Sequence, residues 1–258
     1  MSLDNTALLT DHYELTMVSA ALRGPLAARS CVFEVFARRL PDGRRYGVVA
    51  GTGRLIDELT RFRFGDDEIA QVAQFLDDDT VAWLRDYRFS GDIDGYREGE
   101  LYFPGSPILT VRGTFAEAVI LETLILSILN HDSAIASAAA RMVSAAAKRP
   151  IIEMGGRRTH ERAAVASARA AYLAGVAATS NLEAARTFGV PSAGTAAHAF
   201  TLGFSGPDGP DEKAAFAAQV EALGVGTTLL VDTYDITQGV RAAIEAAGPA
   251  LGAVRLEA

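Results

Sequence analysis

The chain has 258 residues, 49% of them hydrophobic and 22% charged, which is enough to bury a sizeable core in one large domain or two ordinary ones. Its 24 basic and 32 acidic residues give a net charge of -8, which disfavours nonspecific binding to nucleic acid or to an anionic membrane. Cys31 is the single cysteine, which excludes an intrachain disulfide and a cysteine-based metal site. The N-terminus lacks the pattern of a secretory signal, and we predict a cytoplasmic protein.

Residues 1–115 mix β-rich segments with short amphipathic helices. The composition of 31–40 predicts a strand, and the apolar spacing in 53–62 and 66–76 predicts two capped helices. Glycine and proline divide 92–113 into further strands. The first part of the chain is therefore expected to be an α+β domain.

A strongly apolar, alanine-rich stretch covers residues 114–147. Its composition predicts helix throughout, with a break near Asn130, His131 and Asp132 that would make two helices. We expect 116–149 to be a helical connection into a second unit.

Residues 150–258 alternate between short apolar runs and helical patterns. Strict alternation of strand and helix predicts an α/β unit with a parallel sheet, either open or closed into a barrel. The strands are expected at 150–156, 176–180, 190–195, 227–235 and 251–258, and the helices at 161–175, 181–189, 212–224 and 236–248. A closed barrel uses about eight strands, so this unit is expected to be an open sheet or the first part of an incomplete barrel.

Polar residues follow four successive strands of this unit. Arg157 and Arg158 come after the first, the segment 179–181 after the second, Thr195 and His198 after the third, and the segment 232–235 after the fourth. The carboxyl ends of parallel strands point to one face, which carries the active site in α/β barrels. These residues are therefore candidates for a shared site.

Six motifs resemble the nicotinate phosphoribosyltransferase family in order and spacing. They are LLTDHYELTM (8–17), FEVFARRLP (33–41), EMGGRRTH (153–160), RAAYLAGVAATSN (169–181), GVPSAGTAAHAF (189–200) and LLVDTYD (229–235). The resemblance implies a phosphoribosyltransferase-type α/β barrel after the N-terminal domain. It also implies condensation of nicotinate with phosphoribosyl pyrophosphate to nicotinate mononucleotide and pyrophosphate in NAD salvage, with magnesium and coupled ATP hydrolysis.

The resemblance also implies roles for individual residues. His198 matches the histidine that ATP phosphorylates, and Thr195 matches a residue that contacts nicotinate. Tyr13 matches an aromatic residue that covers the pyridine ring from the neighbouring subunit, which implies a homodimer with a shared active site. Arg157 and Arg158 match a pair that faces the anionic substrates. Four further positions match the pocket lining: Ser180, Asn181, Asp232 and Asp235. No metal ligand is assigned.

Each candidate also has a purely structural interpretation. His198 can be a packed or exposed structural histidine, and Arg157 with Arg158 can be a solvated pair at a strand end. Tyr13 can anchor the first helix to its own core. Four polar side chains can serve as helix caps: Ser180, Asn181, Asp232 and Asp235. The segment Gly51–Thr52–Gly53 lacks the third glycine of a dinucleotide-binding fingerprint.

Two departures from the family leave other functions open. After GAVR the family continues into a second half with a phosphate-binding loop, whereas this chain ends at 258, so much of that site is expected to lie outside it. Ala199 stands where a serine commonly follows the histidine. The alternatives are a related nicotinamide or quinolinate phosphoribosyltransferase, or a truncated, non-catalytic form that only forms dimers or binds a full-length partner through the helical region near 114–147.

Overall fold

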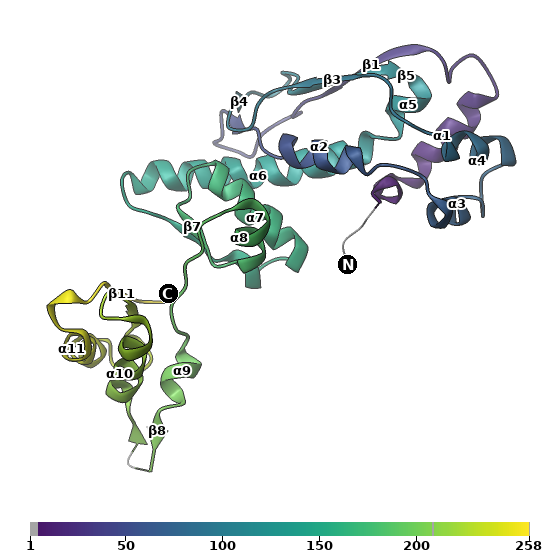
Figure 1. Cartoon of the computed structure of the whole chain (residues 1–258). Helices are drawn as coiled ribbons and strands as arrows, with labels where there is room; N and C mark the ends of the chain where they lie inside the picture. The colour runs from purple at the N-terminus through teal and green to yellow at the C-terminus, as the bar shows by residue number, and fades with distance from the viewer. Residues whose placement is uncertain (1–4, 208, 258) are drawn as a thin grey trace. The chain divides into compact units, whose positions relative to one another are not determined.

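The computed structural model describes residues 5–207 and 209–257. The chain divides into two compact units, Met1–Ser192 (unit 1) and Ala193–Ala258 (unit 2), and each is described by itself (Figure 1). The expected division into 1–115, 116–149 and 150–258 stays a prediction.

Unit 1 contains a three-stranded antiparallel sheet in the order β1, β5, β3. The strands are β1 (Ser30–Val35), β5 (Leu109–Thr114) and β3 (Asp92–Gly95). A separate antiparallel pair joins β2 (Gly47–Val48) to β4 (Leu101–Tyr102). The predicted strands in 31–40 and 92–113 are confirmed, although β1 ends five residues before the predicted segment does.

Unit 1 also contains four short helices, and side-chain caps explain where two of them, α1 and α4, begin. They are α1 (His12–Leu22), α2 (Thr52–Thr60), α3 (Asp66–Val72) and α4 (Asp78–Arg85). Asp11 and Glu14 form a capping box on α1, and the Asp77 carboxylate accepts a hydrogen bond of 2.8 Å from the amide of Thr80 in α4. The predicted helices at 53–62 and 66–76 are confirmed as α2 and α3.

Two helices cover the stretch after the sheet, α5 (Phe115–Val119) and α6 (Glu122–Ala146). The predicted break near Asn130–Asp132 is wrong, because α6 runs through it unbroken and the interruption lies at 120–121. Asp132 stays helical because its buried carboxylate accepts hydrogen bonds from the Arg54 guanidinium on α2. Its polar group is thus satisfied without ending the helix.

The long helix α6 contributes to two different cores. Its N-terminal half places Leu124, Ile125, Ile128 and Leu129 in the main core beneath the sheet, as Figure 1 shows. By length and composition alone, the helical stretch 115–146 could cross a membrane, since an 18-residue window within it has a mean hydropathy of 1.4. Because 56% of this window is buried within the protein, a role in the core explains its apolar composition.

The remainder of unit 1 begins the predicted strand–helix alternation. Its elements are β6 (Ile152–Glu153), the 3-10 helix η2 (Gly155–Arg157), α7 (Glu161–Leu173), β7 (Ala178–Thr179) and α8 (Leu182–Phe188). Strands β6 and β7 pair in parallel, as predicted. The predicted strand at 190–195 is wrong, since only Ser192 bridges to Thr179. Pro191 has no amide hydrogen to donate to a strand ladder, and its carbonyl only accepts from Thr179.

Unit 2 has a small core between two helices and a parallel strand pair. Its helices are α9 (His198–Leu202), α10 (Glu212–Leu223), α11 (Ile236–Ala247) and η3 (Gly248–Ala250). Strands β8 (Ser205–Gly206) and β9 (Gly209–Pro210) form a hairpin, and β10 (Thr228–Leu230) pairs in parallel with β11 (Ala253–Arg255). Phe216, Leu229 and Val231 lie at the centre of this core. Parallel pairing in the second half of the chain is therefore confirmed.

Candidate functional site

The carboxyl ends of β10 and β11 place two acidic side chains next to each other in unit 2. The strands pair in register, with Leu230 opposite Arg255, so Asp232 and Glu257 both follow the same edge. The backbone amide of Glu257 donates a hydrogen bond to Asp232 Oδ2. Strand pairing alone thus brings together two carboxylates that are 25 residues apart in the sequence.

His198 lies at this edge as the first residue of α9. Its Nδ1 is 3.1 Å from the hydroxyl of Thr233, and its Nε2 is 3.5 Å from Glu257 Oε2 and 3.8 Å from Asp232 Oδ1. The imidazole is 37% exposed. One ring nitrogen is therefore held by a hydroxyl and the other faces two carboxylates, while part of the side chain remains exposed to solvent.

The carboxylates around His198 differ in burial and in their hydrogen-bond partners. The Asp232 side chain is 10% exposed, and its buried Oδ1 has no hydrogen-bond partner among the described residues. Burial, together with the negative charges of Asp232 and Asp235, raises the pKa of Glu212 on α10. This end of unit 2 thus gathers negative charge, and two of its buried carboxylate oxygens, Asp232 Oδ1 and Glu212 Oε1, have no hydrogen-bond partner among the described residues. The arrangement favours a positively charged group.

Arg255 connects the predicted residue Thr195 to the same cluster. Its guanidinium donates a hydrogen bond of 2.6 Å to Thr195 Oγ1 and pairs with Glu257. Sequence reasoning missed Arg255, which lies within the predicted strand 251–258. The predicted Asp235 has a capping contact, because its carboxylate accepts from the amide of Gln238 at 2.8 Å at the start of α11.

A second group of predicted residues lies at the carboxyl ends of β6 and β7 in unit 1. Arg157 and Arg158 are exposed, and their side chains have no ion pair or hydrogen bond within the described residues. Ser180 is exposed, and the Asn181 side chain caps α8 by accepting from the amide of Ala184 at 2.9 Å. The arginines are thus free to bind an anion, whereas Asn181 is already engaged.

Hydrogen bonds hold these two strand ends in a fixed arrangement. Thr179 donates from its hydroxyl to Glu153 Oε2 at 2.7 Å, and the amide of Ser180 donates to the Glu153 carbonyl at 2.9 Å. The amide of Gly155 also donates to the Glu153 carboxylate. Glu153 therefore orders the turns on both sides of the candidate residues.

Tyr13, the predicted ring-covering residue, is near the start of α1. Its ring is 44% exposed, and its hydroxyl donates a hydrogen bond of 3.2 Å to Glu122 on α6. Burial and the Glu122 carboxylate raise the pKa of Tyr13. The ring is held at one end and remains accessible, so it is able to stack on a flat partner.

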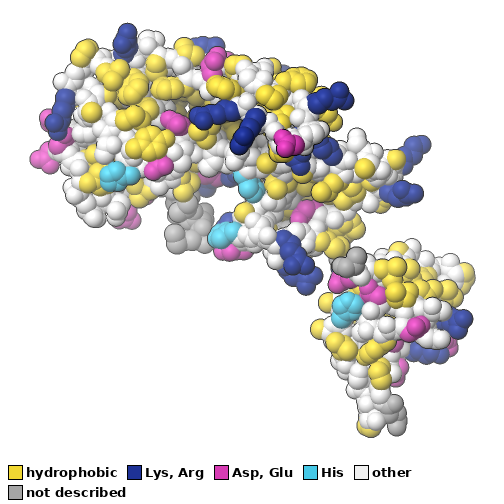
Figure 2. Space-filling view, turned by 180° about the vertical axis from the view of Figure 1, so that it is seen from behind, with side chains coloured by type: hydrophobic (Ala, Val, Ile, Leu, Met, Phe, Trp, Pro, Cys, Tyr) yellow, Lys and Arg dark blue, Asp and Glu magenta, His cyan; other side chains and the backbone are white. Residues whose placement is uncertain are grey.

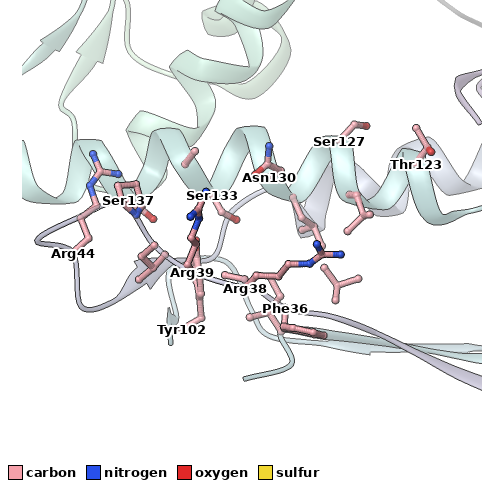
Figure 3. Close-up of a pocket in the computed structure, with 18 residues that line it drawn as sticks. Phe36, Arg38, Arg39, Arg44, Tyr102, Thr123, Ser127, Asn130, Ser133 and Ser137 are labelled. Carbon is pink, nitrogen blue, oxygen red and sulfur yellow. The ribbon is translucent and has the colours of Figure 1, made fainter. Parts of the chain in front are cut away.

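Unit 1 also has an arginine-lined pocket that sequence reasoning did not assign. It lies between the segment 35–44 and α6 and has a volume of about 670 Å³. Figure 3 shows Arg38, Arg39 and Arg44 on one side and a row of hydroxyl and amide side chains along the helix. No carboxylate lines the pocket. In a chain of net charge -8, the dense basic run ARRLPDGRR was the signal available.

The arrangement of this pocket suits an anion that also has an apolar part. Its lining includes Phe36, Leu126 and Leu129. Basic side chains lie among hydrophobic ones on the face of unit 1 shown in Figure 2. Guanidinium groups without carboxylate partners favour phosphate or carboxylate ligands. For metals, no group of three or more His, Cys, Asp and Glu side chains in 5–207 and 209–257 is arranged to hold an ion.

Comparisons with known proteins show which protein family this chain resembles. The profile of the nicotinate phosphoribosyltransferase (NAPRTase) N-terminal domain matches residues 8–130. Nicotinate phosphoribosyltransferase pncB1 of Mycobacterium tuberculosis is 68% identical over 257 residues, which cover 98% of this chain and 57% of that protein. The chain belongs to the nicotinate phosphoribosyltransferase family. The Bacillus subtilis nicotinate phosphoribosyltransferase is 36% identical over 90% of this chain and 47% of its own length.

Solved structures agree with this family assignment. The crystal structure of human nicotinic acid phosphoribosyltransferase matches 96% of this chain with a TM-score of 0.85 at 29% identity. Nicotinate-nucleotide pyrophosphorylase from Pyrococcus furiosus matches with a TM-score of 0.81 at 26% identity. The chain spans 61% and 59% of these two proteins, so it corresponds to a little over half of either. The mixed α/β fold expected from the sequence is confirmed.

Proposed function

We propose that this chain acts in a nicotinate phosphoribosyltransferase, which condenses nicotinate with phosphoribosyl pyrophosphate to nicotinate mononucleotide and pyrophosphate in NAD salvage. The observation that carries the proposal is the 68% identity to a nicotinate phosphoribosyltransferase across 98% of the chain. ATP hydrolysis is coupled to this reaction through phosphorylation of His198, and magnesium accompanies the phosphate-bearing substrates. The cytoplasm is the proposed location.

The surroundings of His198 support its role as the phosphorylated residue. In the tautomer with a proton on Nδ1, that nitrogen donates to Thr233 and Nε2 carries the free lone pair. Nε2 then attacks the γ-phosphorus of ATP, a bond forms between nitrogen and phosphorus, and the bond to the β–γ bridging oxygen breaks to release ADP. Asp232 and Glu257, at 3.8 and 3.5 Å, offset the positive charge that develops on the imidazole.

The same carboxylates repel an incoming polyphosphate, and a cation has to offset that repulsion. A magnesium ion would supply this charge neutralisation. Asp232 would suit such a cation, because its buried Oδ1 has no hydrogen-bond partner among the described residues and lies 3.8 Å from His198 Nε2. No further ligand is assigned to the ion.

Residues in both units suit the recognition of nicotinate and phosphoribosyl pyrophosphate. Arg157 and Arg158 have guanidinium groups with no partner in the described part of the chain, and these groups match the bidentate geometry of phosphate and carboxylate. Thr195 is oriented by Arg255 and is proposed to contact nicotinate. Tyr13 is proposed to cover the pyridine ring in the site of a second copy, since its ring is exposed. Ser180, Asn181 and Asp235 are proposed pocket residues whose contacts are so far only those of their own chain.

Radiolabelled ATP tests the phosphohistidine directly. The purified chain is incubated with magnesium and γ-labelled ATP, and an acid-labile, base-stable phosphate is expected on wild type and not on His198→Ala. His160→Ala is the matched control, because His160 is exposed and lies in unit 1. Equal labelling of His198→Ala and wild type contradicts this assignment.

Calorimetric titration with three pyridines tests the substrate. Nicotinate is expected to bind, whereas nicotinamide and quinolinate bind more weakly. Tight binding of nicotinamide without nicotinate would favour the related phosphoribosyltransferase. Light scattering tests the homodimer, and a dimer that lacks both pyridine binding and labelling would favour the non-catalytic form.

A further inference from the structure

The Gly51–Thr52–Gly53 segment brings the Glu98 carboxylate to the N-terminus of α2. The amide of Gly51 donates to Glu98 Oε1 at 2.7 Å. A Cβ at position 53 would lie 2.8 Å from the Arg169 guanidinium and 3.1 Å from Glu98 Oε2. A side chain here would have to displace the end of Arg169, so glycine leaves room for the ion pair. The motif therefore serves a charged contact between segments of unit 1.

Arg169 on α7 completes that contact with both of its terminal nitrogens. They donate to the two Glu98 oxygens at 2.7 and 2.8 Å, and each partner is only 16% exposed. Burial alone would raise the pKa of Glu98, but Arg169 and the backbone amides of Gly51 and Gly53 outweigh it and lower the pKa. The guanidinium also lies 5.4 Å above the ring of Phe188 in α8. One side chain thus contacts the N-terminal region and the helix after β7.

Alanines occupy much of the packing surface between α6 and α7. Ala136 and Ala170 lie in one buried cluster and Ala139 and Ala171 in another, and Ile135 and Val143 of α6 pack against these alanines. Alanines permit close approach but offer few protruding groups that would penalise a shift along the helix axis. The Glu98–Arg169 pair supplies a directional contact, since both donor and acceptor geometries are bidentate.

The segments that Arg169 restrains lead directly to the candidate binding residues. Helix α7 follows the turn with Arg157 and Arg158, and α8 follows the turn with Ser180. We propose that Arg169 is a positioning residue, which sets the strand-end turns 155–160 and 179–184 by tying α7 and α8 to Glu98. The inference rests on the proposed function for its consequence on substrate binding, although the ordering of the turns is measurable without substrate.

Hydrogen–deuterium exchange of the 258-residue chain tests the positioning. In Arg169→Met, amides in 155–160 and 179–184 are expected to exchange about tenfold faster, which corresponds to ~1.4 kcal/mol of local stability. Arg162→Met is the matched control, because Arg162 is exposed on the same helix, and it is expected to leave these amides unchanged. Arg169→Lys retains the positive charge but not the bidentate geometry of the guanidinium group, and it is expected to give an intermediate exchange rate.

The outcomes separate positioning from general stability and from the proposed reaction. A uniform rise in exchange across unit 1, or equal rates in the 169 and 162 variants, overturns the inference. If Arg169→Met does not fold, Glu98→Gln removes the same pair while retaining the shape of its side chain, and the same two turns are measured. In the proposed reaction, Arg169→Met raises the KM for phosphoribosyl pyrophosphate, by up to about a hundredfold, while His198 labelling persists. Absence of labelling and turnover in wild type would reject the proposed function, and the exchange rates would still decide the positioning.

Discussion

Replacing Asp132 by alanine is expected to destabilise unit 1 more than the loss of an ordinary surface ion pair. The Asp132 side chain is fully buried, and it accepts from Arg54 Nε at 3.1 Å and from a terminal nitrogen of Arg54 at 3.2 Å. It also accepts from His131 Nδ1 at 2.9 Å. Removing the carboxylate leaves the Arg54 charge, itself only 23% exposed, without its partner.

The size of the effect follows from the burial of the two partners. Breaking a fully buried pair costs about 3–5 kcal/mol, whereas an exposed pair contributes about 0–1 kcal/mol. Because Arg54 keeps some contact with water, we expect Asp132→Ala to lower the free energy of unfolding by about 2–4 kcal/mol. Asp132→Asn retains the side-chain shape and is expected to fall between Asp132→Ala and wild type.

Urea unfolding followed by the fluorescence of Trp83 measures this loss. Trp83 is the single tryptophan and packs against the main core, so its signal reports on unit 1. Asp94→Ala is the control, because the Asp94 side chain is 68% exposed in its pair with Arg112. The reasoning is refuted if Asp132→Ala costs no more than Asp94→Ala.

Two further predictions concern unit 2. Gly239→Ala is expected to destabilise it by about 1–3 kcal/mol, since the added Cβ would lie 2.4 Å from the Val231 carbonyl oxygen. Thermal unfolding measures the change, and Gly226→Ala is the control because no atom lies within 4 Å of the Cβ added there. Burial and the charge of Asp232 raise the pKa of Glu212 in the folded protein. The wild type therefore loses folding stability as the pH rises from the pKa of glutamate in the unfolded chain, about 4.3, to the higher pKa of Glu212 in the folded state. Glu212→Gln is therefore expected to slow amide exchange in α10 at pH 7 and not below about pH 4; a difference independent of pH contradicts this.

The sequence predicted helices well where local signals agree. Helices α7, α8, α10 and α11 have apolar spacing and a side-chain cap at their first turn, and both signals are local. The strand predicted at 190–195 failed because an apolar run that includes Pro191 looks like a strand until hydrogen bonding is known. The break in α6 was misplaced because the partner of Asp132 lies 78 residues away.

The candidate site was predictable as a set of residues and not as a set of contacts. Strand ends identified His198 and Asp232, but the Thr233 and Glu257 contacts depend on the pairing of β10 with β11. Arg255 escaped notice because an arginine in a short strand has no distinctive local pattern. Long-range ion pairs such as Glu98–Arg169 leave no periodic signal at all.

The continuous helix α6 has a consequence for insertions and deletions. One half of it packs in the main core, and the other half packs on α7 through Ala136 and Ala139. One added residue between these halves would rotate one relative to the other by about 100° and displace it by about 1.5 Å. Both interfaces could not then be kept at once, so natural length variation in this chain is expected to avoid 129–136 and to occur in connecting segments instead.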